Sequence, residues 1–266
     1  MAIYNITSQQ LKGAGILNSF EIPTVGSFIN TKSLNFDGTD AYLEGSSNYT
    51  LLDGESKATI SAWINLDAGN VNAAYLFAIK EIGSLNFTLG VRLQIIGVNA
   101  TCWVYTQNAS NVNRANISLG SIVGDGSWHH LLICLDLALT GNTEAQVFLD
   151  GVSKGIVGRF QNTTFTSVSA PLYIGHADTY NYINGNIDEF AIWSGTDLRA
   201  NASTIYNSGV PNDLNNNGLT SPTTWYRMGD AATIDGNDIT IPDQIGSYNL
   251  TSEGMVAADV QSDVPS

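Results

Sequence analysis

Apolar and polar residues alternate with a period of two along much of the chain, which indicates β-strands. In residues 58–66 every even-numbered position is apolar, and the odd-numbered positions are polar except for Trp63. Successive side chains of a strand point to opposite faces of its sheet, so this segment predicts a half-buried strand. Further short strands are expected at residues 75–79, 86–96, 101–106 and 117–122, because Gly and Asn clusters separate these apolar runs.

Two Asp-Gly pairs predict tight turns. We expect residues 33–44 to form a hairpin around Asp37-Gly38 and residues 146–157 to form another around Asp150-Gly151, since Asp-Gly readily adopts the positive φ angles of such turns. Residues 131–136 are almost continuously apolar. Such a run is typical of a strand that is buried on both faces, which places it centrally in a sheet.

Residues 183–193 predict the last core strand, and this strand carries an acid. Strand parity places Asp188 on one face with Phe190 and Ile192, and Glu189 on the other. An ionised carboxylate on an apolar face is costly unless it is hydrogen-bonded, paired with a cation or bound to a metal. Two partners for Asp188 stay open: a calcium ion, or backbone N–H groups at the start of the strand.

After this strand the pattern changes. Residues 196–209 fit a helix of two turns, with Thr196 and Asn201 as capping candidates and Gly209 as its stop. A polar linker at residues 212–218 follows. Strand character resumes at residues 224–230 and 238–242, and the remainder to Ser266 is expected to be an extension.

Composition supports an all-β chain with one main domain. Of the 266 residues 13% are charged and 26 are Gly, which favours short strands and polar turns over helices. The net charge of −14 would repel phosphate backbones, so nucleic-acid binding is not expected. No apolar run is long enough for a membrane span, and residues 1–13 lack a secretory pattern, so neither membrane insertion nor export is expected.

Two cysteines, Cys102 and Cys134, each lie within an apolar strand pattern. Two cysteines do not make a stapled disulfide framework, so buried thiols are the simpler interpretation. A disulfide between them is the alternative.

Four blocks of sequence together resemble the laminin G-like family in order and spacing over about residues 30–210. They are residues 33–38, 59–64, 126–130 with 146–151, and 184–190. The resemblance implies a concanavalin A-like jelly roll, an all-β sandwich of two curved antiparallel sheets. It divides the chain into an N-terminal segment at residues 1–30, a candidate assembly contact, the jelly roll at residues 31–210, and a C-terminal extension at residues 211–266 that packs on the domain or on neighbouring subunits.

The resemblance also implies a structural Ca²⁺ site. In the family this ion, where present, is held by an acid of the final core strand together with groups from the first strands. Asp188 matches that acid by position, and Asp37 and Asp40 are the early ligand candidates.

Short stretches near the end of the chain resemble the C-terminal extensions of laminin G-like proteins encoded by bacteriophages. They are residues 225–230, 240–246 and 262–266. A β-hairpin packed on the edge of the sandwich is the alternative interpretation of this segment.

The sequence offers no catalytic constellation, so we expect a protein that is not an enzyme. The paired carboxylates of glycoside hydrolases on this fold follow a Glu-x-Asp-x-x-Glu pattern, which is absent. Asp188 and Glu189 are expected on opposite faces and therefore cannot flank one glycosidic bond. His129 and His130 have no accompanying zinc ligands and are interpreted as structural.

Binding is the remaining function class. Tyr180, Tyr182 and Trp193 gather near the end of the core, and aromatic faces beside Asn and Asp commonly hold sugar rings, although Trp193 also fits a place in the core. The first hypothesis is a structural or adhesive protein on the surface of a phage particle, a capsid decoration or fibre component made in the host cytoplasm. Its partners would be other virion proteins or copies of itself, with host-surface glycans as candidate ligands. The alternative is a cell-surface or secreted carbohydrate-binding module, and an enzyme of the lyase or glucanase type is a third, weaker hypothesis.

Overall fold

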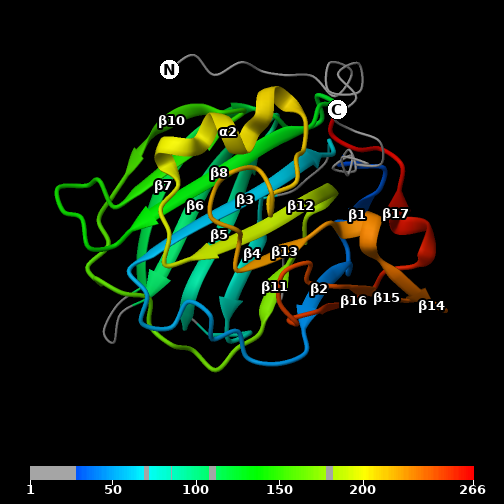
Figure 1. The fold of residues 1–266 in the computed structure, drawn as a ribbon, viewed down its shortest axis with the longest axis horizontal. Coiled ribbons are helices and arrows are strands. Elements are labelled where there is room, and N and C mark those ends of the chain that lie inside the picture. The colour runs from blue at the N-terminus through cyan, green and yellow to red at the C-terminus, as the bar shows by residue number, and fades with distance from the viewer. Residues whose placement is uncertain (1–27, 69–71, 85, 108–111, 178–181) are drawn as a thin grey trace, which may run out of the picture.

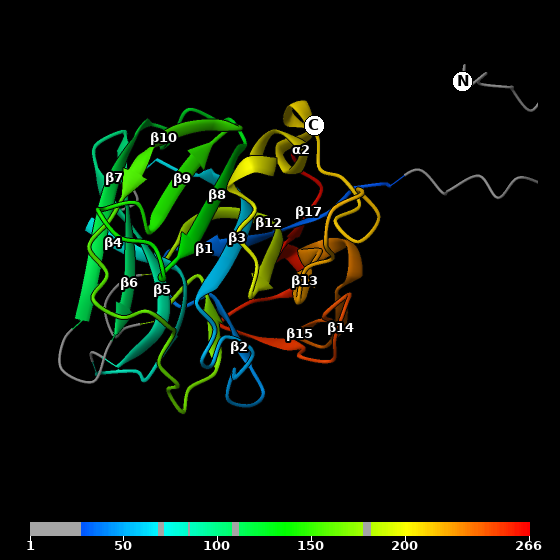
Figure 2. The same cartoon turned by 60° about the vertical axis from the view of Figure 1, so that its left-hand side comes forward.

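The computed structural model describes residues 28–68, 72–84, 86–107, 112–177 and 182–266. Two antiparallel sheets pack face to face, sheet A with eight strands and sheet B with nine. Figure 1 looks onto sheet A, with the short helix α2 (Ala202–Tyr206) over it and sheet B behind. Figure 2 shows the same layers turned by 60°. The predicted all-β jelly roll is confirmed.

Sheet A has the strand order β10-β9-β8-β3-β12-β1-β17, and β13 also pairs with β12. Its strands are β1 (Ser33–Asp37), β3 (Lys57–Leu66), β8 (His129–Asp136), β9 (Ala145–Leu149), β10 (Val152–Val157), β12 (Asn184–Ser194), β13 (Thr224–Tyr226) and β17 (Val260–Gln261). The apolar strand β8 lies inside the sheet between β9 and β3, and nearly all of it is buried, as its sequence predicts.

Sheet B has the order β14-β15-β16-β2-β11-β4-β5-β6-β7. Its strands are β2 (Tyr42–Gly45), β4 (Asn72–Lys80), β5 (Phe87–Ile96), β6 (Asn99–Gln107), β7 (Val112–Ser121), β11 (Leu172–Ile174), β14 (Thr233–Asp235), β15 (Asp238–Ile241) and β16 (Leu250–Glu253). Most strands send alternate side chains into the space between the sheets, where they form the main core. Phe190 is fully buried there, edge-on to Phe77 with ring centroids 5.3 Å apart.

Strand β3 forms as predicted, but the prediction that it is half-buried is wrong. Thr59, Ser61 and Trp63 point away from the main core and yet are no more than 4% exposed. A second apolar cluster covers the outer face of sheet A, built from that face together with α2 and β13. Alternation along one strand shows which residues share a face, but it does not show what packs over the other face.

The predicted hairpin at residues 33–44 is wrong, because β1 and β2 belong to different sheets. Between them the Oδ1 atom of Asp37 accepts hydrogen bonds from the backbone N–H groups of Thr39, Asp40 and Ala41. The turn is present, but it carries the chain from one layer to the other. At the second predicted hairpin β9 and β10 do pair around Asp150-Gly151, where both residues have positive φ angles.

The helical segment after β12 is less regular than predicted. It comprises two 3₁₀ turns, η1 (Arg199–Asn201) and η2 (Asn207–Gly209), on either side of α2. No side chain caps either η1 or α2, so the caps expected at Thr196 and Asn201 are absent. Helix α2 ends at Asn207, whose φ of 49° is left-handed.

Residues 211–266 are part of the sandwich. They supply β13 and β17 to sheet A and β14, β15 and β16 to sheet B, with two further 3₁₀ turns, η3 (Met228–Ala231) and η4 (Ala257–Asp259). Strand β16 pairs with β2, and β17 pairs with β1. The segment therefore extends both sheets.

Cys102 and Cys134 are both buried free thiols, as predicted, and they lie in different sheets. Burial raises the pKa of each thiol to about 12. Within the described residues, no helix has the length and apolar character that a membrane span needs.

Candidate functional site

The outer face of sheet B carries a band of aromatic rings. Strand register sets Tyr173 of β11 and Tyr105 of β6 in one row across the sheet, with the small residues Ala78 and Gly90 between them. The ring of Phe87 stacks on Tyr105 with centroids 5.5 Å apart, and Trp103 lies 6.4 Å from Tyr105 on its other side. Helix α2 lies over the opposite sheet. Tyr173, Tyr105 and Phe87 are no more than 8% exposed, whereas Trp103 is half-buried, so among these four rings Trp103 is the one that a ligand can approach.

Two arginines stand among these rings. Arg92 of β5 is opposite Trp103, and Arg114 of β7 is opposite Tyr105. The guanidinium carbon of Arg92 lies 5.2 Å from the Tyr105 ring centroid, and that of Arg114 lies 5.7 Å from the Trp103 ring centroid. These distances allow cation–π attraction. We call these four residues the Trp103 patch.

Burial and the two nearby arginines both affect the pKa of Tyr105. Burial raises the pKa of its phenol, and the positive charges of Arg92 and Arg114 act in the opposite direction. The phenol is therefore neutral at physiological pH and is available as a hydrogen-bond donor.

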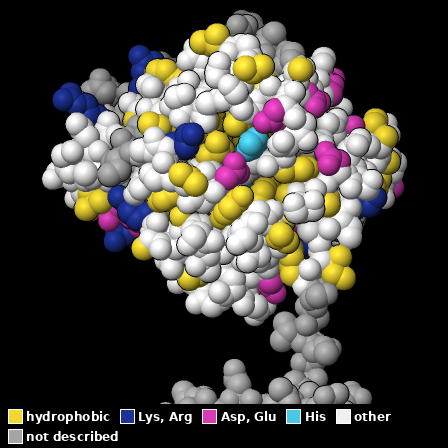
Figure 3. All heavy atoms as spheres, turned by 90° about the horizontal axis from the view of Figure 1, so that it is seen from above, with side chains coloured by type: hydrophobic (Ala, Val, Ile, Leu, Met, Phe, Trp, Pro, Cys, Tyr) yellow, Lys and Arg dark blue, Asp and Glu magenta, His cyan; other side chains and the backbone are white. Residues whose placement is uncertain are grey.

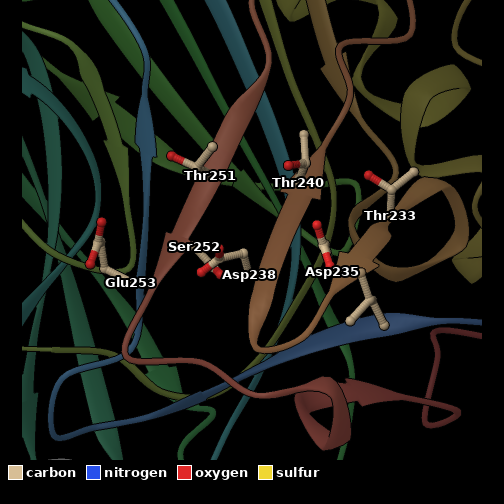
Figure 4. Close-up of a pocket in the computed structure, with 8 residues that line it drawn as sticks. Thr233, Asp235, Asp238, Thr240, Thr251, Ser252 and Glu253 are labelled. Atoms are coloured by element: carbon tan, nitrogen blue, oxygen red, sulfur yellow. The ribbon is translucent and has the colours of Figure 1, made fainter.

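Charge divides the outer face of sheet B into two halves. Lys80, Arg92 and Arg114 lie on β4, β5 and β7, whereas the acids lie on β2 and β14–β16. Figure 4 shows the acidic half, where three threonines line up across β14, β15 and β16 beside Asp235, Asp238 and Glu253. Seen from above in Figure 3, lysine and arginine side chains gather mainly toward the β7 and β10 side of the molecule.

The aromatic residues predicted as ligand-binding do not form one site. Tyr182 stacks on His176 with centroids 4.1 Å apart and lies 6.2 Å from the ring of Tyr42, next to sheet B. Trp193 instead lies in the cluster outside sheet A, is 1% exposed and donates its indole N–H to the Thr220 carbonyl oxygen at 2.8 Å. Tyr180 lies outside the described residues. Tyr182 alone adjoins the aromatic face.

The predicted parity around Asp188 is wrong, because β12 contains a bulge. Its register against β3 shifts between Asp188 and Ala191, and Glu189 adopts a φ of 47°. Phe190 faces the main core, whereas Asp188 is opposite Trp63, which points outward. The bulge therefore brings Asp188 and Glu189 to the same side of sheet A, and the argument that they diverge fails.

Both acids are enclosed by hydrogen bonds. Asp188 accepts from the side-chain amide of Asn30 and from the backbone N–H of Glu189, each at 2.8 Å. Glu189 accepts from the Trp225 indole at 2.6 Å and from the Arg227 Nε atom at 3.1 Å. A backbone N–H partner, one of the two alternatives left open for Asp188, is thus present, together with an amide that the sequence did not indicate.

Arg227 links this acid cluster to the start of the described chain. Its Nη2 atom donates to Asp230 at 3.0 Å and to the carbonyl oxygen of Ile29. Its guanidinium carbon lies 4.3 Å from the Phe28 ring centroid. Arg227 therefore forms ion pairs with both Glu189 and Asp230 and holds residues 28–29 against the domain.

Burial of the acids perturbs their protonation. Burial, together with the neighbouring Glu189 charge, raises the pKa of Asp188 well above its ordinary value. Burial raises the pKa of Glu189 to about 7, although Arg227 opposes this shift. Asp188 is 0% exposed and Glu189 is 2% exposed. The cluster is therefore an internal one that a polysaccharide cannot reach.

The residues predicted to hold calcium do not fit one ion. Asp37 pairs with Asn184 in the sheet register, four residues from Asp188 along β12. That interval corresponds to roughly 13 Å in a strand, far beyond the 2.3–2.6 Å Ca²⁺–oxygen bonds that a shared ion needs. Asp40 belongs to the Asp37 turn. Within the described residues no group of three His, Cys, Asp or Glu side chains is arranged to hold a metal.

The two neighbouring histidines are held by residues of the domain. His129 lies between Asp150 at 2.8 Å and Asp125 at 3.1 Å, and the hydrogen bond with Asp150 raises its pKa. His130 is buried, hydrogen-bonds the Ser61 hydroxyl at 2.8 Å, and has a pKa lowered by burial to about 4. These contacts agree with the structural interpretation.

The fold defines a lectin-type β-sandwich protein. Residues 37–201 match the family model described as concanavalin A-like lectin/glucanases superfamily, in its laminin G-like group. Because this match spans more than half of the chain, the chain belongs to that family.

Solved structures are similar to the chain at low sequence identity. A heptameric SAP-like pentraxin from Limulus polyphemus has 14% identity and a TM-score of 0.51, covering 67% of this chain and 83% of its own. Tailspike protein 2 from an Escherichia coli O157:H7 bacteriophage has 14% identity and a TM-score of 0.48, covering 71% and 29%. Domains LG4-5 of the mouse laminin alpha1 chain have 12% identity and a TM-score of 0.44, covering 62% and 41%. No curated protein sequence matches the chain.

Sequence reasoning missed the Trp103 patch. Trp103 and Tyr105 share a parity in a strand that was predicted, opposite to that of the buried Cys102 and Val104. That pattern was a usable signal for two aromatic residues on the outer face of the sheet, of which Trp103 is half-buried and Tyr105 is buried. The arginines come from other strands, so their approach depends on a register that the sequence does not reveal.

Proposed function

We propose that the protein is a non-enzymatic adhesion protein that binds glycans through the aromatic outer face of sheet B. The observation that supports this proposal is the Trp103 patch together with its neighbouring rings. Trp103 is the half-buried ring of this patch and is backed by the buried rings of Tyr105 and Phe87. An aromatic face with polar groups beside it is how proteins hold sugar rings. The strands hold these side chains in place, so little order has to be gained on binding.

A binding function fits the buried acids better than hydrolysis does. Glycoside hydrolysis needs two carboxyl groups that reach the scissile bond from opposite sides. Asp188 and Glu189 lie on one side of sheet A and are shielded from solvent. Their carboxyl oxygens accept hydrogen bonds from Asn30, Trp225 and Arg227.

The finer proposal is that this adhesion serves the surface of a phage particle, as a capsid decoration or fibre component. Its support is the resemblance of residues 225–230, 240–246 and 262–266 to phage-encoded proteins. The partners would be other virion proteins or copies of this chain, and host-surface glycans would be the ligands. Mass spectrometry of purified particles tests this setting, while an export signal in the full reading frame would favour a cell-surface or secreted binding module.

Glycan binding is tested with the purified full chain on a panel of immobilised neutral and acidic polysaccharides. We expect the wild type to bind at least one of them and Trp103→Ala to weaken that binding by about tenfold or more. Trp128→Ala is the matched control, since Trp128 is also half-buried but hydrogen-bonds Asp263 on the sheet A side. Absence of binding to every polysaccharide, or equal losses in both variants, would count against the proposal.

A further inference from the structure

The Trp103 patch concentrates positive charge without compensating acids. The chain has 24 acidic and 10 basic residues, so most basic side chains should find a carboxylate. Arg199, for example, lies 2.6 Å from the Asp197 carboxylate. Among the described residues no carboxylate forms an ion pair with Arg92 or Arg114, which approach aromatic rings instead. The patch is therefore a cationic surface on an acidic protein.

Two buried donors in the patch also have no partner among the described residues. The Nε–H group of Arg92 and the hydroxyl of Tyr105 are inaccessible to solvent and make no hydrogen bond. Tyr105 is only 5% exposed. A buried donor without an acceptor is costly. Because both atoms are enclosed, a ligand would meet the exposed Arg114 and the half-buried Arg92 and Trp103, and the two positive charges favour an anionic ligand.

From this combination we propose that the Trp103 patch binds the carboxylate of an acidic saccharide, one built from uronic acid or sialic acid units. The proposal rests on the glycan-binding function and adds the class of ligand. A guanidinium group is planar and donates two parallel hydrogen bonds to a carboxylate, which a neutral sugar cannot accept in the same way. Trp103, which is half-exposed, offers a ring on which the sugar packs.

The position of the patch favours a saccharide over an acidic peptide. Trp103 and Tyr105 belong to β6, which is paired on both sides, by β5 and by β7. A peptide that adds a strand needs an unpaired sheet edge, and the patch offers only side chains across paired strands. The acidic half of a second copy of this chain would also complement the charge. The groove of that half in Figure 4, however, offers no planar ring for Trp103, because it is lined by threonine, serine, isoleucine and acidic side chains.

The test measures binding of defined probes to the full chain by calorimetry at low and high salt. The carboxylated probes are a trigalacturonate and 3′-sialyllactose, the neutral probes are galactotriose and lactose, and an oligosaccharide of κ-carrageenan supplies sulfate esters without carboxylates. The variants are Arg114→Gln, Arg92→Gln and Arg92→Lys. Lys57→Gln is the control, because it removes the same charge from sheet A, where Lys57 pairs with Asp136 at 3.2 Å. Thermal melts establish that each variant is folded.

We expect a carboxylated probe to bind at least tenfold more tightly than its neutral counterpart, and the affinity to fall as salt rises. Arg92→Gln and Arg114→Gln should each bind the carboxylated probe at least tenfold more weakly than the wild type. Lys57→Gln should bind it with wild-type affinity, and the affinity of Arg92→Lys should lie between those of Arg92→Gln and the wild type. Equal affinity for neutral and carboxylated probes, or losses shared by the control, overturns the assignment while leaving glycan binding intact.

Two other results would also overturn it. Tighter binding of the sulfated probe assigns the patch to sulfate esters. Self-association that Arg114→Gln abolishes, measured by light scattering, assigns the patch to a second copy. If no saccharide of any kind binds, the glycan-binding function itself fails, and this result is distinct from all the others.

Discussion

Replacing Glu189 by Gln should change how stability depends on pH. Glu189 is buried beside Asp188 and shares the single cation Arg227 with Asp230. Burial raises its pKa from the ordinary 4.5 to about 7. The folded state therefore keeps a proton that the unfolded state releases, and stability falls as pH rises from about 4.5 to about 7. The substitution removes this titration and keeps the side-chain shape.

The size of the effect follows from the difference between the two pKa values. A difference of about 2.5, at roughly 1.36 kcal/mol for each, gives about 3 kcal/mol of folding free energy lost between pH 4 and pH 8. His130 acts in the opposite direction, because burial lowers its pKa from 6.5 to about 4. The contribution of His130 to folding stability rises with pH over nearly the same range. The two effects therefore cancel in part, and the pH profile of wild-type stability alone does not reveal either group.

The measurement is therefore a difference between two proteins. Urea unfolding of the wild type and of Glu189→Gln is followed by tryptophan fluorescence at pH 4, 6 and 8. The variant should gain at least about 3 kcal/mol relative to the wild type between pH 4 and pH 8, because His130 contributes equally to both and Asp188 no longer faces the Glu189 charge that helps to raise its pKa. Glu253→Gln, at an exposed position, is the control and should show no such gain. A difference that stays constant with pH would refute the reasoning.

Three further predictions test the core, the thiols and the absence of a shared calcium ion. Phe190→Ala should lower the free energy of unfolding by about 3–5 kcal/mol in urea titrations, because its ring fills the space between the sheets, and a loss below about 1 kcal/mol would contradict this packing. A thiol reagent should label neither Cys102 nor Cys134 in native buffer and both in urea, since both are buried with pKa values near 12, whereas rapid native labelling would contradict their burial. Millimolar Ca²⁺ should leave the melting temperature unchanged against a chelator control, because Asp37 and Asp188 are too far apart to share an ion, and a rise of several degrees would show that calcium is bound after all.

The sequence predicts where the strands lie along the chain better than it predicts which strands pair with each other. The alternation in residues 58–66 and the apolar run at residues 131–136 identify β3 and β8, because both patterns are local properties of a strand. The chemistry at Asp37-Gly38 likewise indicates a turn. Whether that turn joins two strands of one sheet or leads to the other sheet depends on contacts with β12 and β11, which are distant in sequence.

The site was harder to predict for the same reason. The bulge adds one residue to β12, and no sequence pattern at Asp188 or Glu189 indicates that it is there. The bulge places Asp188 on the outer face of sheet A instead of the expected inner face. The Trp103 patch draws its arginines from strands on either side of β6, so that its chemistry appears only when the register is known.

The way the last fifty-six residues join both layers has a practical consequence for anyone who trims the protein. A fragment stopped at the end of η2 would lose β16 and β17 at once, and so would leave β2 and β1 with bare backbone donors and acceptors. Exposed strands of that kind recruit other chains, so such a truncated fragment would aggregate rather than behave as a smaller lectin domain.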